Sequence, residues 1–140
     1  MIVLGIDPDA VKHGVAVYNN GVLTGLFSMT LVDLHKASFF NADLIAIEHV
    51  CANNGVFTKD PKRKIGRARS LGRVQQSQAE LERFADHYEI KIKHYRISSS
   101  WKSAAGKKQM EKITGWSGRS NEDTRSAAYF GFLAAVKHKG

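Results

Sequence analysis

The sequence is poor in the residues that stabilise small secreted or fibrous proteins. Its single cysteine, Cys51, excludes an internal disulfide framework and a metal site made of cysteines alone, and it indicates a reducing compartment. With two prolines and twelve glycines among 140 residues, the chain has neither a collagen-like nor a disordered composition. The apolar run at residues 2–6 stops at Asp7, too early for a signal peptide or a membrane span. We therefore expect a cytoplasmic protein without a membrane partner.

The apolar content is high enough for a core, and the charge is strongly positive. Hydrophobic residues make up 43% of the chain, and no linker rich in proline, glycine or serine divides it. We therefore expect residues 1–140 to fold as a single domain. Lys and Arg number 21 against 13 Asp and Glu, a formal net charge of +8, which favours a polyanionic partner.

Much of this positive charge lies in residues 59–73, where the only acid is Asp60. The candidates for contact with nucleic acid in this segment are Lys62, Arg63, Lys64, Arg67, Arg69 and Arg73. A second basic run contains Lys102, Lys107, Lys108 and Lys112. The alternative interpretation is an ordinary solvated surface. The local concentration of charge, close in sequence to the acids described below, favours nucleic acid.

Hydrophobic periodicity and turn residues predict an α/β fold. Strands are predicted at residues 2–6, 14–18, 22–29, 43–48 and 90–97, with a hairpin turn at Asn20-Gly21. Helices are predicted at residues 31–40 and 67–88, from a cap at Ser98–Ser100 to Ile113, and from a cap at Ser120-Asn121 to about Lys137. Residues 49–66 are predicted to form a loop. This order indicates a mixed five-stranded sheet, with its first three strands antiparallel, flanked by helices.

Acidic residues stand where these elements end or begin. Asp7 ends the first strand, Glu48 ends the fourth, and Glu122 and Asp123 open the last helix. Ligand crevices form at strand ends beside parallel neighbours, so these carboxylates are expected to converge. The alternative is that Asp7 is a turn residue, Glu48 an exposed strand terminus, and the other two complements of the helix dipole, with Ser120-x-x-Asp123 forming a capping box.

Converging carboxylates have a specific chemical use. Like charges at close range are unfavourable unless a cation or a shared proton lies between them. Hard oxygen ligands suit Mg²⁺, with Mn²⁺ able to substitute for it. Two such ions about 3.5–4 Å apart activate water and stabilise the leaving oxygen of a phosphodiester. A basic protein with this cluster is therefore predicted to be a metal-dependent nuclease without a small-molecule cofactor.

Segments along most of the chain, in the same order, resemble RuvC-type Holliday-junction resolvases of the RNase H-like superfamily. Gly5-Ile-Asp-Pro-Asp-Ala-Val-Lys-His-Gly14 resembles the family's G-[IL]-D-P-G-x4-G opening, and Ile45-Ala-Ile-Glu48 resembles its second acidic strand. Gly72-Arg73 resembles the start of its long helix. Trp101-Lys102 and Lys107-Lys108 resemble the lysines after its fifth strand, and Asp123-Thr-Arg-Ser-Ala-Ala128 resembles its final D/H-x-x-D-A segment.

Three positions depart from the family pattern. Asp9 stands where the family usually has glycine, and His13 where it often has threonine. Ser126 stands where the terminal aspartate is expected, one helical turn after Asp123. The metal ligands implied are then Asp7, Glu48 and Asp123, with Glu122 as a possible substitute. The chain is also shorter than the usual bacterial enzyme, which fits a compact version encoded by a phage or prophage.

The resemblance implies an RNase H-like fold and a homodimer that binds a four-way DNA junction. Each subunit would nick one strand with Mg²⁺, leaving a 5′-phosphate and a 3′-hydroxyl. Lys102 and Lys108 would neutralise the scissile phosphate. Phe57 is a candidate for stacking on bases near the junction, the alternative being that it docks onto its own domain.

Two other functions remain open on the sequence. An RNase H-like nuclease acting on RNA or an RNA–DNA hybrid would use the same carboxylates. A non-catalytic nucleic-acid-binding module would keep the basic segment without the metals, and Ser126 keeps this interpretation open. His49 follows Glu48 directly and is expected on the opposite face of its strand, in a structural role.

Overall fold

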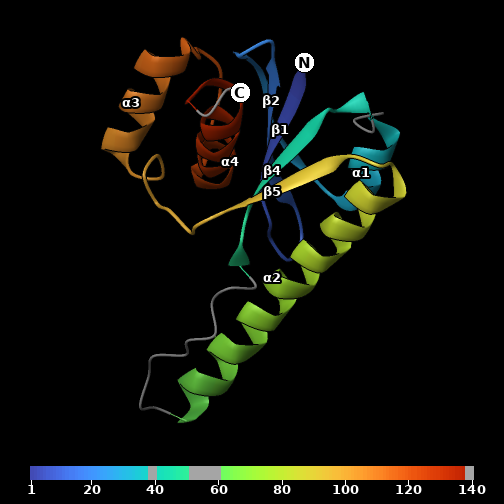
Figure 1. The fold of residues 1–140 in the computed structure, drawn as a ribbon. Coiled ribbons are helices and arrows are strands. Elements are labelled where there is room, and N and C mark those ends of the chain that lie inside the picture. Colours follow the sequence, from blue (N-terminus) through green and yellow to red (C-terminus); the bar gives the residue numbers. More distant parts are fainter. Residues whose placement is uncertain (38–40, 51–60, 138–140) are drawn as a thin grey trace.

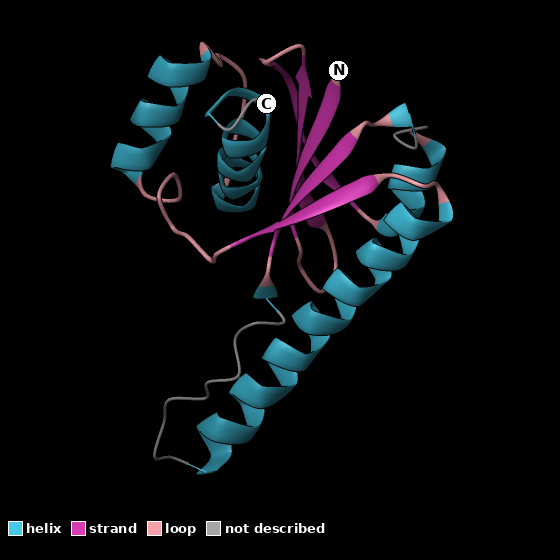
Figure 2. Ribbon diagram, viewed as in Figure 1, coloured by secondary structure: helices cyan, strands magenta, loops and turns pink. Residues whose placement is uncertain are grey.

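The protein is built around a mixed five-stranded sheet with helices on both faces (Figures 1 and 2). The structure, a computed structural model, describes residues 1–37, 41–50 and 61–137, but within residues 61–70 only the side chains at 68 and 69. The strands are β1 (Ile2–Asp7), β2 (His13–Asn19), β3 (Val22–Met29), β4 (Leu44–Glu48) and β5 (Lys91–Tyr95). The helices are α1 (Leu31–Lys36), α2 (Pro61–His87), α3 (Ala104–Thr114), α4 (Glu122–Phe132) and the π-helical η3 (Leu133–Lys137).

The strand order β3-β2-β1-β4-β5 confirms the predicted sheet. β1 pairs antiparallel with β2 and parallel with β4, and β5 adds to β4 as a parallel edge strand. The β2–β3 hairpin turns at Asn20 and Gly21, whose φ angles of 51° and 83° are both positive, as the predicted Asn-Gly turn requires.

The core is divided between the two faces of the sheet because side chains alternate along each strand. Val3 and Ala46 face a cluster that includes Trp101, Met110 and Phe130, under α3 and α4. On the other face, the sheet packs against α1 and the C-terminal half of α2; that cluster includes Leu4, Ile6, Ile45, Ile47, Leu34, Leu81 and Phe84.

Close packing of α4 on the sheet depends on glycine in β1. A Cβ atom built on Gly5 would lie 2.0 Å from the backbone oxygen of Ala127 and 2.7 Å from the backbone nitrogen of Gly131. Only a residue without a side chain allows the two backbones to approach this closely. Gly5 thus sets the distance between β1 and α4.

Helix α2 starts earlier than the sequence predicted. Residues 49–66 were expected to form a loop, but α2 already begins at Pro61, while residues 51–60 lie outside the described part. Proline is well suited to the first turn of a helix, because its missing N–H has no partner there and its φ is already helical. The N-terminal half of α2 extends away from the sheet (Figure 1).

The cap of α3 differs from the prediction, whereas the cap of α4 confirms it. Ser98 and Ser100 bond to each other, with 2.8 Å between their hydroxyl oxygens, and the cap of α3 is Ser103 instead. At α4, Asn121 is the cap, which confirms the predicted cap at Ser120-Asn121, and its capping box is formed with Thr124 and not by the alternative Ser120-x-x-Asp123. The predicted helix at residues 31–40 is described only as Leu31–Lys36. No helix in the described ranges is long and apolar enough to cross a membrane.

Candidate active site

Two buried carboxylates lie side by side at one edge of the sheet. Asp7 and Glu48 end the neighbouring parallel strands β1 and β4, one position beyond the aligned pair Ile6 and Ile47. Each has only 4% of its surface exposed. The two side chains lie close enough for Glu48 to raise the pKa of Asp7. The predicted convergence of these two strand ends is therefore present.

Helix α4 adds a third carboxylate to this edge. Its N-terminus lies against β2, because a Cβ on Gly14 would be 2.2 Å from the backbone oxygen of Asp123, and Gly14 is the β2 partner of Asp7. Asp123 is half-buried and interacts electrostatically with Asp7. Since Asn121 and Thr124 cap the helix, the Asp123 side chain is not used in the capping box.

Burial and mutual repulsion raise the pKa values of two of these acids, Asp7 and Asp123. Burial raises the pKa of Asp7 from 3.8 to about 7, and the neighbouring Glu48 charge adds to the effect. The pKa of Asp123 rises to about 6, first through burial and then through the charges of Asp7 and Asp9. A bound divalent cation would reverse this balance by favouring the ionised carboxylates.

Lys102 is the cation that the protein itself places beside these acids. Its Nζ lies 3.8 Å from Oδ2 of Asp7, and its charge lowers the pKa of both Asp7 and Asp123. Residues 101 and 102 are held by Arg125 of α4, whose Nε donates to the Trp101 carbonyl at 2.9 Å and whose Nη2 donates to the Lys102 carbonyl at 2.6 Å.

Arg125 is a residue that sequence reasoning missed. It is buried, with 8% of its surface exposed, and it ties the loop that carries Lys102 to the helix that carries Asp123. In the sequence it stands out only as one of many positive charges. Its position between Asp123 and Ser126, in a helix with a buried face, could have indicated that Arg125 lies near the site.

Two oxygen atoms at the site have no hydrogen-bond partner among the described residues. Oδ2 of Asp7 and Oγ of Ser126 are both buried and unpaired. The Ser126 hydroxyl lies close enough to Asp7 to lower its pKa, although the two atoms do not form a hydrogen bond of standard geometry. Buried polar atoms normally find a partner, so an orphaned pair beside three acids points to a missing ligand.

The donor set fits a hard divalent cation. Asp7, Glu48 and Asp123 offer only carboxylate oxygens, the ligands that Mg²⁺ and Mn²⁺ prefer, and one of these oxygens is orphaned. As arranged, no group of three or more His, Cys, Asp or Glu side chains in the described part of the chain is positioned to hold a metal ion. Binding therefore requires these side chains to turn.

The other predicted site residues lie farther out or outside the described part of the chain. Glu122 is exposed at the start of α4. Lys107 and Lys108 are exposed on α3, and Arg69 and Arg73 are exposed on α2. Lys62, Arg63, Lys64 and Arg67 belong to α2 by their backbone, but their side chains lie outside the described part, as does all of Phe57.

His49 points away from the carboxylates, as predicted. Its Nδ1 is 3.0 Å from Nε2 of Gln78 in α2, and its ring lies 4.7 Å from that of His94. Gln78 also donates to Glu82 at 2.7 Å. This network connects the end of β4 to α2 on the face opposite α4.

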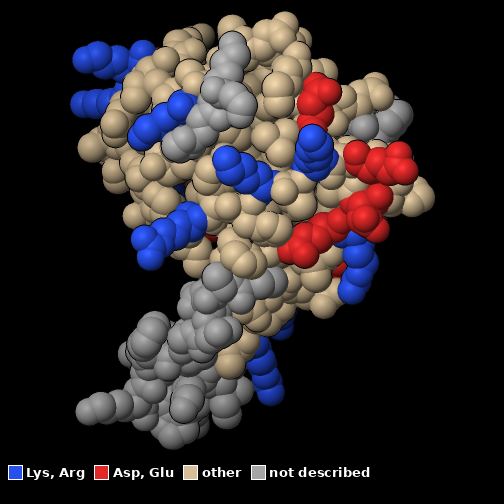
Figure 3. All heavy atoms as spheres, in the orientation of Figure 1, with Lys and Arg blue, Asp and Glu red and all other residues tan. Residues whose placement is uncertain are grey.

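Charged side chains are distributed unevenly over the surface. In Figure 3, acidic side chains gather on the side of α1 and the C-terminal part of α2, while basic side chains lie across the middle and over the side of α3.

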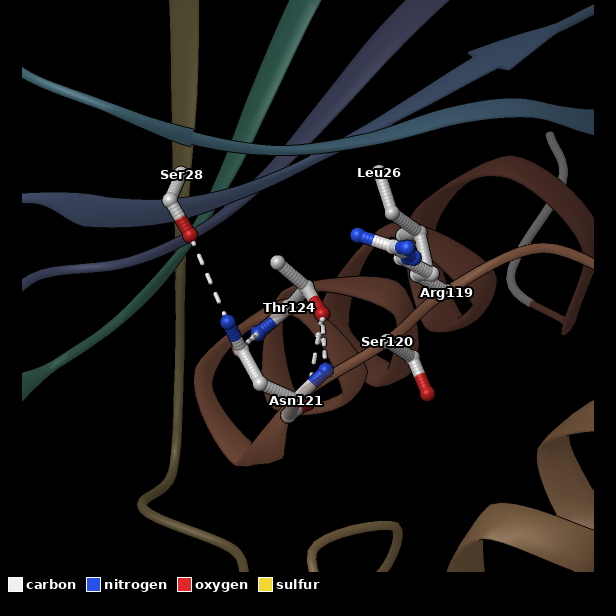
Figure 4. A pocket seen from close by; sticks show the side chains of 6 residues that line it. All are labelled: Leu26, Ser28, Arg119, Ser120, Asn121 and Thr124. Carbon is white, nitrogen blue, oxygen red and sulfur yellow. Dashed lines mark hydrogen bonds between the residues drawn. The ribbon is translucent and has the colours of Figure 1, made fainter.

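An open pocket of about 310 Å³ lies beside the start of α4, lined by Leu26, Ser28, Arg119, Ser120, Asn121 and Thr124 (Figure 4). There Asn121 donates to Ser28 of β3 at 3.4 Å. None of the three acids lines this pocket.

Known structures share this fold. The chain is similar to the structure of Thermus thermophilus RuvC in complex with a Holliday junction substrate, with a TM-score of 0.62 and 15% identity, over 98% of this chain and 94% of that one. A second Thermus thermophilus RuvC structure gives a TM-score of 0.50 and 17% identity, over 94% of this chain and 92% of that one. Comparison of the sequence with family models and with curated proteins finds no match. The predicted RNase H-like fold of the RuvC type is thus confirmed.

Proposed function

We propose that this protein is a divalent-metal-dependent endonuclease that resolves four-way DNA junctions by paired nicks. The observation that carries the proposal is the convergence of buried Asp7 and Glu48 with Asp123 at the strand ends. The fold supports it, because a similar structure is RuvC bound to a Holliday junction substrate. The excess of positive charge fits a nucleic-acid partner.

In this proposal the three acids hold the metal. Asp7 interacts electrostatically with both Glu48 and Asp123, so it would be the central ligand. Divalent ions held by these residues would supply an activated water and stabilise the leaving oxygen of the phosphodiester. Burial of Asp7 and Glu48 removes competing water and strengthens their interaction with a cation.

Lys102 has two uses in the proposed reaction. Without metal it offsets the negative charge of Asp7 across 3.8 Å. With metal bound, its ammonium is free to turn toward the scissile phosphate and stabilise the charge that develops there. Arg125 keeps the Lys102 backbone in place during that change, so it is a positioning residue.

The DNA would lie across the edge where β1 and β4 end. Figure 1 shows the N-terminal half of α2 extending from this same side of the molecule. The basic residues of the first turns of α2 would then contact phosphates on the junction arms. Paired nicks need two sites, so the proposal includes a homodimer with one site in each subunit.

The decisive experiment is cleavage of a synthetic four-way junction with Mg²⁺, comparing the wild type with Asp7→Asn and Glu48→Gln. We expect cleavage by the wild type, none in EDTA, and none by either variant. Binding of the junction should persist or tighten, because each change removes negative charge beside phosphate. Asp86→Asn, an exposed acid near the end of α2, is the matched control and should cleave normally.

The outcomes separate this function from the alternatives. Cleavage in EDTA would overturn the metal mechanism, and joint loss of binding and cleavage in the variants would assign the acids a folding role. Ser126 favours a second candidate, a non-catalytic binding module, since a serine adds no charge to a metal site. Junction binding without cleavage under any divalent metal would support that candidate. Preferential cleavage of an RNA–DNA hybrid in competition would indicate a ribonuclease.

A further inference from the structure

The open pocket beside the start of α4 lies close to the carboxylates but has no part in the proposed metal site. It is formed between β3 and the residues around the start of α4 (Figure 4). Along the sheet, Asp7 of β1 is paired with Gly14 of β2, and Gly14 is paired with Ser28 of β3. Because neighbouring strands lie about 4.8 Å apart, the Ser28 backbone is about 10 Å from that of Asp7. The pocket is therefore a neighbour of the candidate active site.

The polar side chains of the pocket are arranged as hydrogen-bond donors. Nδ2 of Asn121 donates to the Ser28 hydroxyl at 3.4 Å. Nη1 of the buried Arg125 donates to the Ser120 hydroxyl at 3.3 Å. Because each hydroxyl oxygen already accepts a hydrogen bond, its own hydrogen is available to donate to a ligand. The exposed guanidinium of Arg119 adds further donors and a full positive charge.

The acceptors at this place are already used, and negative charge is absent from the lining. Oδ1 of Asn121 accepts from the Thr124 N–H at 2.8 Å, and the Thr124 hydroxyl donates to the Asn121 carbonyl at 3.2 Å. No Asp or Glu lines the pocket, and no acid in the described part of the chain forms an ion pair with Arg119. A pocket with free donors, a guanidinium and no carboxylate is suited to an anion.

We propose that this pocket binds one phosphate of the DNA strand that is cut, a few nucleotides from the scissile phosphate. This inference rests on the proposed endonuclease and adds a contact that sets the register of the strand. Arg119 pairs with the phosphate oxygens, and the hydroxyls of Ser28 and Ser120 donate to them. Successive nucleotides rise by about 3.4 Å along a strand, so about 10 Å corresponds to about three nucleotides. A volume of about 310 Å³ suits one sugar–phosphate unit.

The first test measures binding of a synthetic four-way junction in EDTA, where the proposed reaction does not run. Arg119→Gln should weaken binding by about 10-fold, the effect of losing a hydrogen bond between charged groups. The slope of log K against log salt should decrease by about 0.9, the value for one phosphate. Arg83→Gln is the matched control, because Arg83 is exposed on the C-terminal part of α2, and it should change neither quantity.

The second test uses junctions in which one phosphate is replaced by an uncharged methylphosphonate. The wild type should bind about 10-fold more weakly when the replaced phosphate is the one that occupies the pocket. Arg119→Gln should lose this sensitivity, because the contact is already absent. Ser28→Ala should weaken binding by about 2- to 10-fold without changing the salt slope, since it removes a neutral donor. Circular dichroism of each variant shows that the fold is retained.

Three results would overturn the proposal. Arg119→Gln could bind the junction as Arg83→Gln does, or it could stay as sensitive as the wild type to every methylphosphonate. Calorimetry with inorganic phosphate gives the third: binding that depends on Arg119, together with no sensitive methylphosphonate, would assign the pocket to a free phosphate ion.

This inference and the proposed function fail separately. Junction cleavage by a protein without an Arg119-dependent phosphate would reject the pocket and keep the endonuclease. An Arg119-dependent phosphate in a protein that binds the junction but never cuts it would keep the pocket as a nucleic-acid contact and reject the endonuclease. A wild type that does not bind the junction would reject both.

Discussion

At Asp7, the requirements of cation binding and of the stability of the metal-free folded protein oppose each other. It is buried beside Glu48, its pKa is raised to about 7, and one of its oxygens has no hydrogen-bond partner within the described structure. Such an arrangement lowers the stability of the metal-free protein at neutral pH and prepares the carboxylate for a cation. Residues with this conflict concentrate at functional sites.

The pH dependence of stability follows from the direction of that shift. The folded protein holds a proton on Asp7 that the unfolded chain releases near pH 3.8, so stability is greatest below that pH and falls as the pH rises through about 7. In EDTA at pH 8, we expect Asp7→Asn to raise the free energy of unfolding by roughly 1–3 kcal/mol, within the limit of about 1.4 kcal/mol per pKa unit. Urea unfolding at pH 4 and pH 8 measures it.

The controls distinguish this effect from a general change in packing. At pH 4 the gain should nearly vanish, because Asp7 is then protonated in the folded protein and asparagine replaces a neutral acid. Mg²⁺ at pH 8 should stabilise the wild type more than Asp7→Asn. If Asp7→Asn instead lowers the free energy of unfolding at pH 8 in EDTA, the negative charge of Asp7 stabilises the folded protein and the prediction is wrong.

Glu122 and Asp123 are neighbours in sequence with different expected roles. Asp123 is half-buried and interacts with Asp7, whereas Glu122 is exposed and lies about 100° around the helix. We expect Asp123→Asn to reduce junction cleavage by about 100-fold or more, the order of effect of removing one electrostatic group from a site. Glu122→Gln should change it by less than about threefold, since an exposed charge interacts weakly.

The measurement is the cleavage rate against Mg²⁺ concentration for both variants. Asp123→Asn should also shift the curve to higher Mg²⁺, because the variant has one metal ligand fewer. An inactive Glu122→Gln beside a normal Asp123→Asn would show that the wrong face of α4 had been assigned to the site.

At the scale of elements, α4 determines the geometry of the site. It carries Asp123 and Ser126, and its Arg125 holds the Lys102 backbone. Tyr18 of β2 fixes it further by donating to the Ala128 carbonyl at 2.7 Å. The close approach of α4 to the sheet is possible because Gly5 and Gly14 lie beneath it.

Glycine replacements test that dependence. Gly5→Ala places a Cβ 2.0 Å from a backbone oxygen of α4, so we expect a loss of at least about 2 kcal/mol in the free energy of unfolding, as overpacking at a rigid contact causes. Gly72→Ala is the matched control: apart from the nearby backbone of α2 itself, no atom of the described residues lies within 4 Å of the added Cβ, and the change should stabilise the helix by up to about 1 kcal/mol. Urea unfolding compares the two, and a neutral Gly5→Ala would mean that α4 can move freely.

At the scale of the whole molecule, the positive charge of +8 is the property most relevant to a DNA partner. Its densest part is the start of α2, which extends away from the sheet on the side of the carboxylates (Figure 1). Long-range attraction to phosphate depends on that placement, and so does the salt dependence of binding.

The test replaces basic residues of α2 by glutamine and measures DNA binding at several salt concentrations. The residues are Lys62, Arg63, Lys64, Arg67 and Arg69. Affinity for every DNA form should fall, and the slope of log K against log salt should decrease by up to about 0.9 for each phosphate that the variant no longer neutralises. Replacing the exposed Lys36 and Lys91, which lie outside this segment, is the control. An unchanged slope would show that the basic segment does not bind phosphate.

The sheet and the first two acids were predictable because they depend on local patterns. Alternating or continuous apolar runs end at Asp7 and Glu48, and parallel strands bring their carboxyl ends together wherever they pair. The Asn20-Gly21 turn likewise follows from two residues that accept positive φ. Helix boundaries were less certain, because Pro61 and the serines before α3 allow more than one start.

Local sequence patterns were therefore enough to predict the order of the elements, the excess of positive charge and the meeting of Asp7 with Glu48. Features that depend on the packing of α4 were not predictable: Lys102 lies beside Asp7, Arg125 holds the Lys102 backbone, and Ser126 is buried with no hydrogen-bond partner among the described residues. The reason is physical: each of these features depends on how α4 is rotated and how closely it lies on β1 and β2. Neither quantity is set by local periodicity, since both result from the packing of segments more than a hundred residues apart.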